Sequence, residues 1–145
     1  MKTTFNVFTK LLFASVFLAN SAFADITIKD AYLRAVPPGQ MMSAAFMQLT
    51  NDTDKALTIV GGSSEFVKSI EVHNHTKVDG VMKMRRVPGL TIEAGSTTVL
   101  KPGGLHIMFI GLKKMIKAGD NFSFELTFDD GTSQAVVLPV ESIIK

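Results

Sequence analysis

Two of the chain's three histidines and two of its eight methionines fall in residues 73–86, which read HNHTKVDGVMKMRR. Imidazole nitrogen and thioether sulfur together favour a soft metal ion. Met sulfur carries no proton at ordinary pH and suits Cu(I), whereas Ca²⁺, Mg²⁺ and Zn²⁺ prefer other ligands. The residue types in this stretch therefore point to copper, provided that the chain brings the side chains together.

A two-residue turn at Asp79-Gly80 would bring them together. The Asp-Gly pair favours a type I′ hairpin turn, because both central positions of that turn need a positive φ. The pairs expected to face each other are then His75 with Met84, Lys77 with Met82, and His73 with Arg86. On the same face, His73 is a diagonal neighbour of Met84.

A second His–Met pair lies in GGLHIMFIGL, residues 103–112. Strand alternation sends Leu105, Ile107 and Phe109 to one face, which is apolar and is expected to face the core. His106 and Met108 then project together from the other face, away from the bulk of the core. Two His with two Met would give a low-coordinate or tetrahedral Cu(I) site.

Other interpretations of the same residues stay open. A single Met is often a filler of irregular core gaps, and a single His is usually a surface or hydrogen-bonded residue. The pairing of His with Met in two separate strands favours a metal site over these alternatives. Met47 is expected in the core, whereas Met41 and Met42 follow a Pro-Pro-Gly turn and could be either exposed contact residues or gap fillers.

The elements that must position these residues are predicted to be strands. Short apolar or alternating runs are separated by Gly, Pro, Asn and Asp, and no long window keeps a helical period. The expected strands span residues 26–34, 44–50, 56–60, 69–77, 81–87, 97–100, 105–111, 121–128 and 133–140. Eight or nine strands with frequent turns predict an all-β fold, either an antiparallel sandwich or a Greek-key barrel.

Residues 1–24 are expected to be a secretory signal peptide. Lys2 and Lys10 precede or flank the apolar residues 11–19, and small residues before Ala24 suit cleavage near that position. The alternative is an uncleaved anchor, but the apolar run is short for a membrane span. The mature protein is then one exported domain of residues 25–145 that is not held in the membrane.

Composition excludes several kinds of function. Without cysteine the chain cannot form a blue-copper centre, a zinc ribbon, an iron–sulfur cluster or a thiol nucleophile. Two of the 15 basic residues lie in the signal, which leaves 13 basic against 13 acidic residues and no nucleic-acid footprint. The sequence also lacks a phosphate-binding loop and a nucleophile elbow, so it favours a protein that is not an enzyme.

At this level of detail the sequence resembles a known family, the periplasmic copper chaperones called PCuAC. His73, ten residues, Met84, twenty-one residues and His106-x-Met108 fit the family's ligand spacing. The segment DAYLRAVPPGQMMSAAFMQLTN resembles the family's N-terminal region, and DGVMKMRRV and LKPGGLHIMFIGLK resemble its metal-binding segments. The similarity covers most of residues 25–145. In place of the Met that the family often has two residues after the first His, this chain has His75.

The resemblance implies a cupredoxin-like Greek-key barrel with His73, Met84, His106 and Met108 as copper ligands. It also implies delivery of Cu(I) to the CuA subunit of cytochrome c oxidase, with or without a Sco-type partner. His75 is a possible additional ligand and could favour Cu(II). Two alternatives remain, a periplasmic copper buffering or acquisition protein and a β-sandwich interaction module that binds no metal. In each case a monomer is expected.

Overall fold

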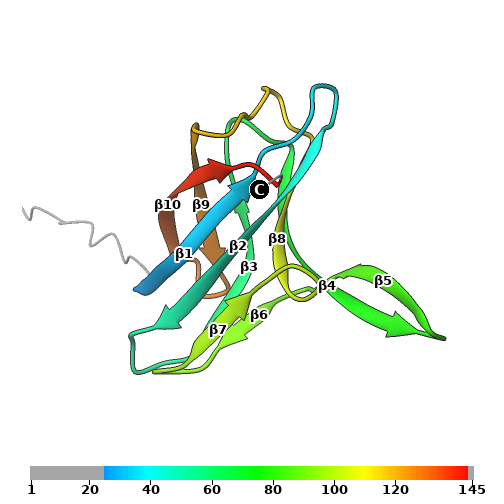
Figure 1. Ribbon diagram of the computed structural model, residues 1–145. Helices are drawn as coiled ribbons and strands as arrows, with labels where there is room; N and C mark the ends of the chain where they lie inside the picture. The colour runs from blue at the N-terminus through cyan, green and yellow to red at the C-terminus, as the bar shows by residue number, and fades with distance from the viewer. Residues whose placement is uncertain (1–24, 144–145) are drawn as a thin grey trace, which may run out of the picture.

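Alternating apolar and polar residues produce the strands that make up this protein. The computed structural model describes residues 25–143, in which ten strands and no helix occur (Figure 1). The strands are β1 (Ile26–Arg34), β2 (Met42–Asn51), β3 (Leu57–Ser63), β4 (Ser69–Val78), β5 (Val81–Arg86), β6 (Leu90–Ile92), β7 (Thr97–Leu100), β8 (His106–Ile110), β9 (Asn121–Phe128) and β10 (Ser133–Glu141). Over this range no helix long and apolar enough to cross a membrane is found. The predicted signal peptide, residues 1–24, lies outside the described residues.

Seven of the strands close into a barrel. Their order is β4-β8-β2-β1-β10-β9-β3, and β3 pairs with β4 between Gly62 and Ile70 to complete the ring. The β1–β10 pair is parallel and the other pairs of the ring are antiparallel. β6 pairs with β3, β7 pairs with β2, and β5 continues β4 as a hairpin that projects from the barrel (Figure 1). The predicted all-β barrel is confirmed, with ten strands in place of eight or nine.

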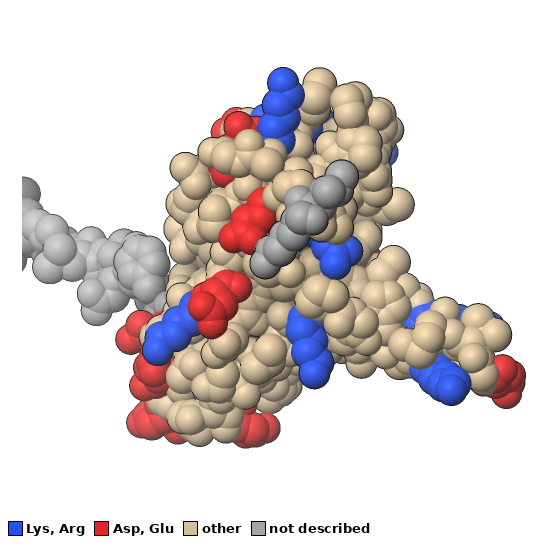
Figure 2. Space-filling view, viewed as in Figure 1, with Lys and Arg blue, Asp and Glu red and all other residues tan. Residues whose placement is uncertain are grey.

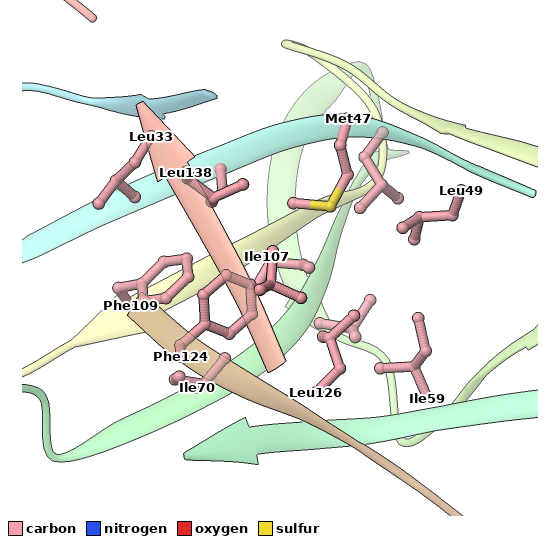
Figure 3. Close-up of a cluster of buried hydrophobic side chains, with 14 of the residues drawn as sticks. Leu33, Met47, Leu49, Ile59, Ile70, Ile107, Phe109, Phe124, Leu126 and Leu138 are labelled. Atoms are coloured by element: carbon pink, nitrogen blue, oxygen red, sulfur yellow. The ribbon is translucent and has the colours of Figure 1, made fainter. Parts of the chain in front are cut away.

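The interior of the barrel is filled by the inward-facing residues of the strands. In β9 every second residue is buried, as strand alternation requires. The ring of Phe109 meets Phe122 and Phe124 edge to face at centroid distances of 5.3 and 5.0 Å, and each such pair adds about 0.5–1.5 kcal/mol beyond its buried area. Met47 is buried in the same cluster (Figure 3), so its expected core position is confirmed.

Two local features differ from the predicted strand pattern. β6 is an additional strand of three residues between two turns, too short to give a periodic signal, and it forms because Leu57 and Ile92 pair across β3 and β6. Gly61 and Gly62 continue β3 beyond residue 60, where the predicted strand ends. A Cβ atom at Gly62 would collide with the carbonyl oxygen of Glu125 on β9, so glycine here permits two strands to approach closely.

The hairpin of β4 and β5 has the predicted turn. Asp79 and Gly80 have φ values of 51° and 78°, as a type I′ turn requires. The three facing pairs expected from that turn are all present: His75 with Met84, Lys77 with Met82, and His73 with Arg86. The register that aligns the candidate ligands is therefore set by two residues at the tip of the hairpin.

Candidate metal centre

Three adjacent strands, in the order β5-β4-β8, carry the candidate ligands. His73 on β4 lies opposite His106 on β8, whereas His75, two residues further along β4, lies opposite Met84 on β5. Because residues two apart in a strand share a face, both histidines of β4 point to the same side of the sheet. The structure thus brings together side chains that are up to 35 residues apart in the sequence.

The closest contact in this group joins His106 to Met84. Nε2 of His106 lies 3.1 Å from Sδ of Met84. The ring centroid of His106 is 5.2 Å from that of His75 and 6.1 Å from that of His73. A pocket of about 240 Å³ opens between them, lined by Arg34, Ala44, Phe46, His75, Met84, Pro102, Gly103, His106 and Met108. Three of the four predicted ligands and His75 therefore line one pocket, whereas His73, two residues before His75 on β4, is not part of the lining.

The hydrogen bonds of His106 determine which of its nitrogens is free. Nδ1 lies 2.9 Å from the carbonyl oxygen of Gly104, which only accepts, so Nδ1 carries the proton and donates it. In the neutral ring Nε2 is then an unprotonated electron-pair donor, directed at the sulfur of Met84. Metal-binding histidines commonly donate their other ring N–H to a carbonyl oxygen, which fixes the tautomer and the orientation of the ring.

Glu71, on the same strand, orients the ring of His73 in a similar way. Its Nε2 lies 2.9 Å from the Glu71 carboxylate and donates to it, which leaves Nδ1 as the free nitrogen. Nδ1 of His73 and Nδ1 of His75 are both buried and have no hydrogen-bond partner among the described residues. Buried polar atoms without partners are rare and costly. These two atoms are therefore suited to accept a cation.

His106 and Met108 are more buried than the strand pattern alone indicates. They point away from the hydrophobic core, as expected, yet their exposed fractions are only 2% and 7%. Phe46 covers this second face, with its ring centroid 6.1 Å from that of His106. The guanidinium of Arg34 lies 4.8 Å from the centroid of Phe46. The strand β8 is thus covered on both faces.

Burial also sets the protonation of His106. Desolvation lowers the pKa of His106 below its ordinary value of about 6.5, and the hydrogen bond to Gly104 opposes this change. Electrostatic interactions with His75, His73 and Arg34 lower the pKa further. His106 is therefore neutral, and able to bind a cation, at neutral pH.

Sequence reasoning missed several residues that shape this site. Glu71 could have been found, because it lies two residues before His73 and must share its face. Arg34 on β1 and Phe46 on β2 reach the site only through the strand order of the barrel, and no local pattern marks them. Gly104 acts through its backbone carbonyl, which every residue has.

The hairpin that carries Met84 is exposed and basic. Met84 is 46% exposed, and every residue of β5 is exposed. Figure 2 shows Lys and Arg side chains on the projecting hairpin. The basic residues of β4 and β5 are Lys77, Lys83, Arg85 and Arg86, of which Arg86 lies 3.7 Å from the Glu71 carboxylate. One predicted ligand is therefore within reach of another molecule, while His106 and Met108 are not.

Histidines and carboxylates alone do not form a metal-binding group among the residues that the structure describes. Among residues 25–143, no group of three or more His, Asp or Glu side chains is arranged to hold a metal ion. The methionines at the start of β2 are exposed, 56% for Met41 and 47% for Met42, so these residues are not gap fillers.

Substitution of Glu71 by glutamine is expected to weaken copper binding about tenfold, in line with the 10- to 100-fold effect of groups that orient metal-binding histidines. An amide can still accept from His73, but it can also present its NH₂ group and no longer fixes the tautomer. Competition with a Cu(I) chelator measures the affinity. Glu65→Gln, a change of the same kind on an exposed loop residue away from the pocket, is the matched control. Equal affinities for the two variants would contradict this role of Glu71.

The pH dependence of stability should report the lowered pKa of His106. Between that pKa and about 6.5, the unfolded chain binds more protons at this residue than the folded chain does, so stability is lost as the pH falls through this interval and the loss ends below the folded pKa. Urea unfolding of the metal-free protein at a series of pH values measures the effect. His106→Gln should have a flatter profile in this interval. If the two profiles have the same slope, His106 is not the cause.

With the geometry established, known proteins provide a comparison. Residues 26–140 match the family described as "Putative lipoprotein LpqE-like". Among curated relatives, "Putative lipoprotein Lxx21020" of Leifsonia xyli subsp. xyli is 35% identical over 117 residues, which are 80% of this chain and 69% of the relative.

Solved structures of PCuAC domains share the fold. The CuI form of DR1885 from Deinococcus radiodurans is 33% identical, with a TM-score of 0.67 and coverage of 88% of this chain and 85% of that one. The copper-bound PCuAC domain from PmoF2 has a TM-score of 0.68 and covers 83% of this chain and 96% of its own, although it is only 22% identical. These matches confirm the predicted cupredoxin-like Greek-key barrel. The chain therefore belongs to the LpqE-like family, the family of the PCuAC domains.

Proposed function

We propose that this chain is an exported metallochaperone, not an enzyme, that binds one Cu(I) ion and passes it to another protein. The observation that carries the proposal is the 3.1 Å approach of His106 Nε2 to Met84 Sδ. Since the proton of His106 is on Nδ1 and a thioether has none, neither atom can donate a hydrogen bond to the other. A soft cation bound by both atoms would explain why His106 Nε2 and Met84 Sδ lie so close together.

The proposed ligands are His73, Met84, His106 and Met108. The buried Nδ1 of His73 and the pocket-lining sulfur residues Met84 and Met108 support this set. His75 is the alternative to His73, because it lines the pocket and its ring is closer to His106. Comparing His73→Ala with His75→Ala separates the two: the larger loss of Cu(I) affinity identifies the nitrogen ligand from β4.

Cu(I) is the preferred oxidation state in this proposal. Two thioethers are soft ligands and suit the monovalent ion. Arg34 lines the same pocket, and its positive charge repels a divalent ion twice as strongly as a monovalent one. Cu(II) remains possible if both histidines of β4 bind, since imidazole also suits that ion.

Copper would leave the site on the side of Met84. This ligand lies on an exposed strand at the end of the sheet, so an incoming protein can contact it without opening the barrel. The proposed client is the CuA subunit of cytochrome c oxidase, directly or with a Sco-type protein, and the family resemblance supports it. A copper buffering or acquisition protein is the second candidate, because the same exposure would serve exchange with free copper complexes.

An anaerobic titration with Cu(I) tests binding itself. We expect one Cu(I) per chain with at least micromolar affinity, and loss of that binding when Met84 and His106 are both replaced by alanine. Absence of binding, or full binding by the double variant, would favour the alternative of an interaction module with no metal.

Transfer distinguishes a chaperone from a buffering protein. Copper-loaded protein should metallate an isolated apo CuA domain faster than a small-molecule Cu(I) complex of the same affinity does. If the two donors are equally fast, and deletion of the gene leaves oxidase activity normal at low copper, the buffering role is the correct one.

Export is also part of the proposal, since such a client faces the periplasm. A mature protein that begins at Asp25 would support cleavage of residues 1–24 as a signal peptide, and its N-terminus can be read by mass spectrometry. A mature chain that retains the apolar residues 11–19 would instead support a membrane anchor.

A further inference from the structure

A second pocket lies directly beside the His–Met pocket. It has a volume of about 260 Å³ and is lined by Arg34, Val36, Gln40, Met42, Ser43, Ala44, Met84, Met108 and Ile143. Four of these residues, Arg34, Ala44, Met84 and Met108, also line the first pocket. The sulfur-bearing side chains of Met84 and Met108 therefore border both spaces, and Met42 adds a third thioether to the second pocket alone.

The strand register explains why Met42 reaches this place. Ala44 on β2 lies opposite Met108 on β8, and Met42 lies opposite Ile110. Met42 is thus a diagonal neighbour of Met108 on the same face, at a separation of about 7–8 Å that long side chains can span. Met42 is also 47% exposed, so the third thioether lies where the pocket meets solvent.

The lining of the second pocket selects a particular class of ion. Among residues 25–143, no carboxylate and no imidazole lines it, which leaves hard divalent ions without suitable ligands. Arg34 adds a positive charge that opposes divalent ions further. Three thioethers next to a guanidinium suit a soft monovalent cation, Cu(I) or its analogue Ag(I).

We propose that Met42, Met84 and Met108 form a second position for Cu(I), through which copper enters and leaves the His–Met site. This inference rests on the proposed function, since it assumes that the first pocket holds Cu(I). Copper moves from the imidazoles to the sulfur of Met42 while Met84 and Met108 stay bound. The ion remains Cu(I), and because thioethers bind without losing a proton, the step needs no electron or proton transfer.

The position of Met42 gives the step a direction. His106 is buried, Met42 is exposed where the second pocket meets solvent, and Met84 and Met108 line both pockets. A ligand exchange in which two sulfurs stay bound avoids a free ion as an intermediate. Removing the sulfur of Met42 should therefore slow both loading and unloading.

Stopped-flow transfer of Cu(I) from the loaded full chain to bathocuproine disulfonate tests this inference. Met42→Leu keeps the size of the side chain and removes the sulfur, and transfer is expected to slow about fivefold or more. Met82→Leu is the matched control, because Met82 is an exposed methionine that lines neither pocket, and its transfer rate should equal that of the native protein. In a parallel Ag(I) titration, the ¹³C-methyl NMR signal of Met42 should shift and that of Met82 should not.

The possible results separate this inference from the proposed function. Native transfer rates in Met42→Leu, or an unchanged Met42 methyl signal, would overturn the second position while leaving the His–Met site intact. A native protein that takes up no Cu(I) at all would overturn both. Equal slowing of Cu(I) transfer in Met42→Leu and Met82→Leu would also overturn the second position, because a loss of exposed thioethers in general would then be the cause.

Discussion

Replacing His106 by alanine is expected to weaken Cu(I) binding by at least about 100-fold, since loss of a group that merely orients a ligand already costs about 10- to 100-fold. His106 supplies the nitrogen that lies 3.1 Å from the sulfur of Met84, and its lowered pKa keeps that nitrogen free at neutral pH. Anaerobic competition with a chelator of known Cu(I) affinity measures the change.

Burial of His106 makes a structural control necessary. The side chain is 98% buried and donates to the Gly104 carbonyl, so alanine leaves both a cavity and an unpaired acceptor. His106→Gln, whose amide NH₂ can also donate to a carbonyl, is the second variant. Its Cu(I) affinity should fall as far as that of His106→Ala. A folded His106→Gln protein with native affinity would remove His106 from the proposed site.

Met84→Leu is expected to lower the affinity for Cu(I) by about 10- to 100-fold, because one soft ligand is lost and no other thioether of β5 can take its place. Met82 projects from the same strand but lies opposite Lys77, two residue pairs nearer the turn. The stability of the protein should change by less than about 0.5 kcal/mol, since Met84 is exposed and leucine has a similar size. Urea unfolding measures this second quantity.

Met82→Leu is the matched control for this prediction. Both methionines are about half exposed, at 56% and 46%, and both face the same side of the hairpin, but only Met84 lines the pocket with His106. Native affinity in Met82→Leu together with a large loss in Met84→Leu is the expected result. Similar losses in both variants would show that the hairpin binds copper without a defined site.

The register of the hairpin was predictable because two residues determine it. Asp79 and Gly80 adopt the positive φ values that a type I′ turn needs, and every facing pair follows from them. The face of β8 that points into the core was predictable for a similar reason, since Ile107 and Phe109 alternate with His106 and Met108. Short-range geometry is thus well encoded in residue type and spacing.

Features that depend on strand order could not be predicted in the same way. β6 has only three residues and forms because it pairs with the edge of β3. Gly62 belongs to β3 because the backbone of β9 approaches it closely. The cover over His106 comes from Arg34 and Phe46 on two distant strands. For the same reason, the sequence placed His75 beside His73 without indicating which of them lines the pocket.

X-ray absorption of the Cu(I)-loaded protein tests the central claim most directly, because it counts the sulfur and nitrogen atoms bound to copper. The proposed site predicts a shell with two sulfur atoms, from Met84 and Met108, and one or two imidazole nitrogens, with one sulfur fewer in Met84→Leu. A shell of oxygen and nitrogen alone, or a sulfur count that Met84→Leu leaves unchanged, would contradict the His–Met site.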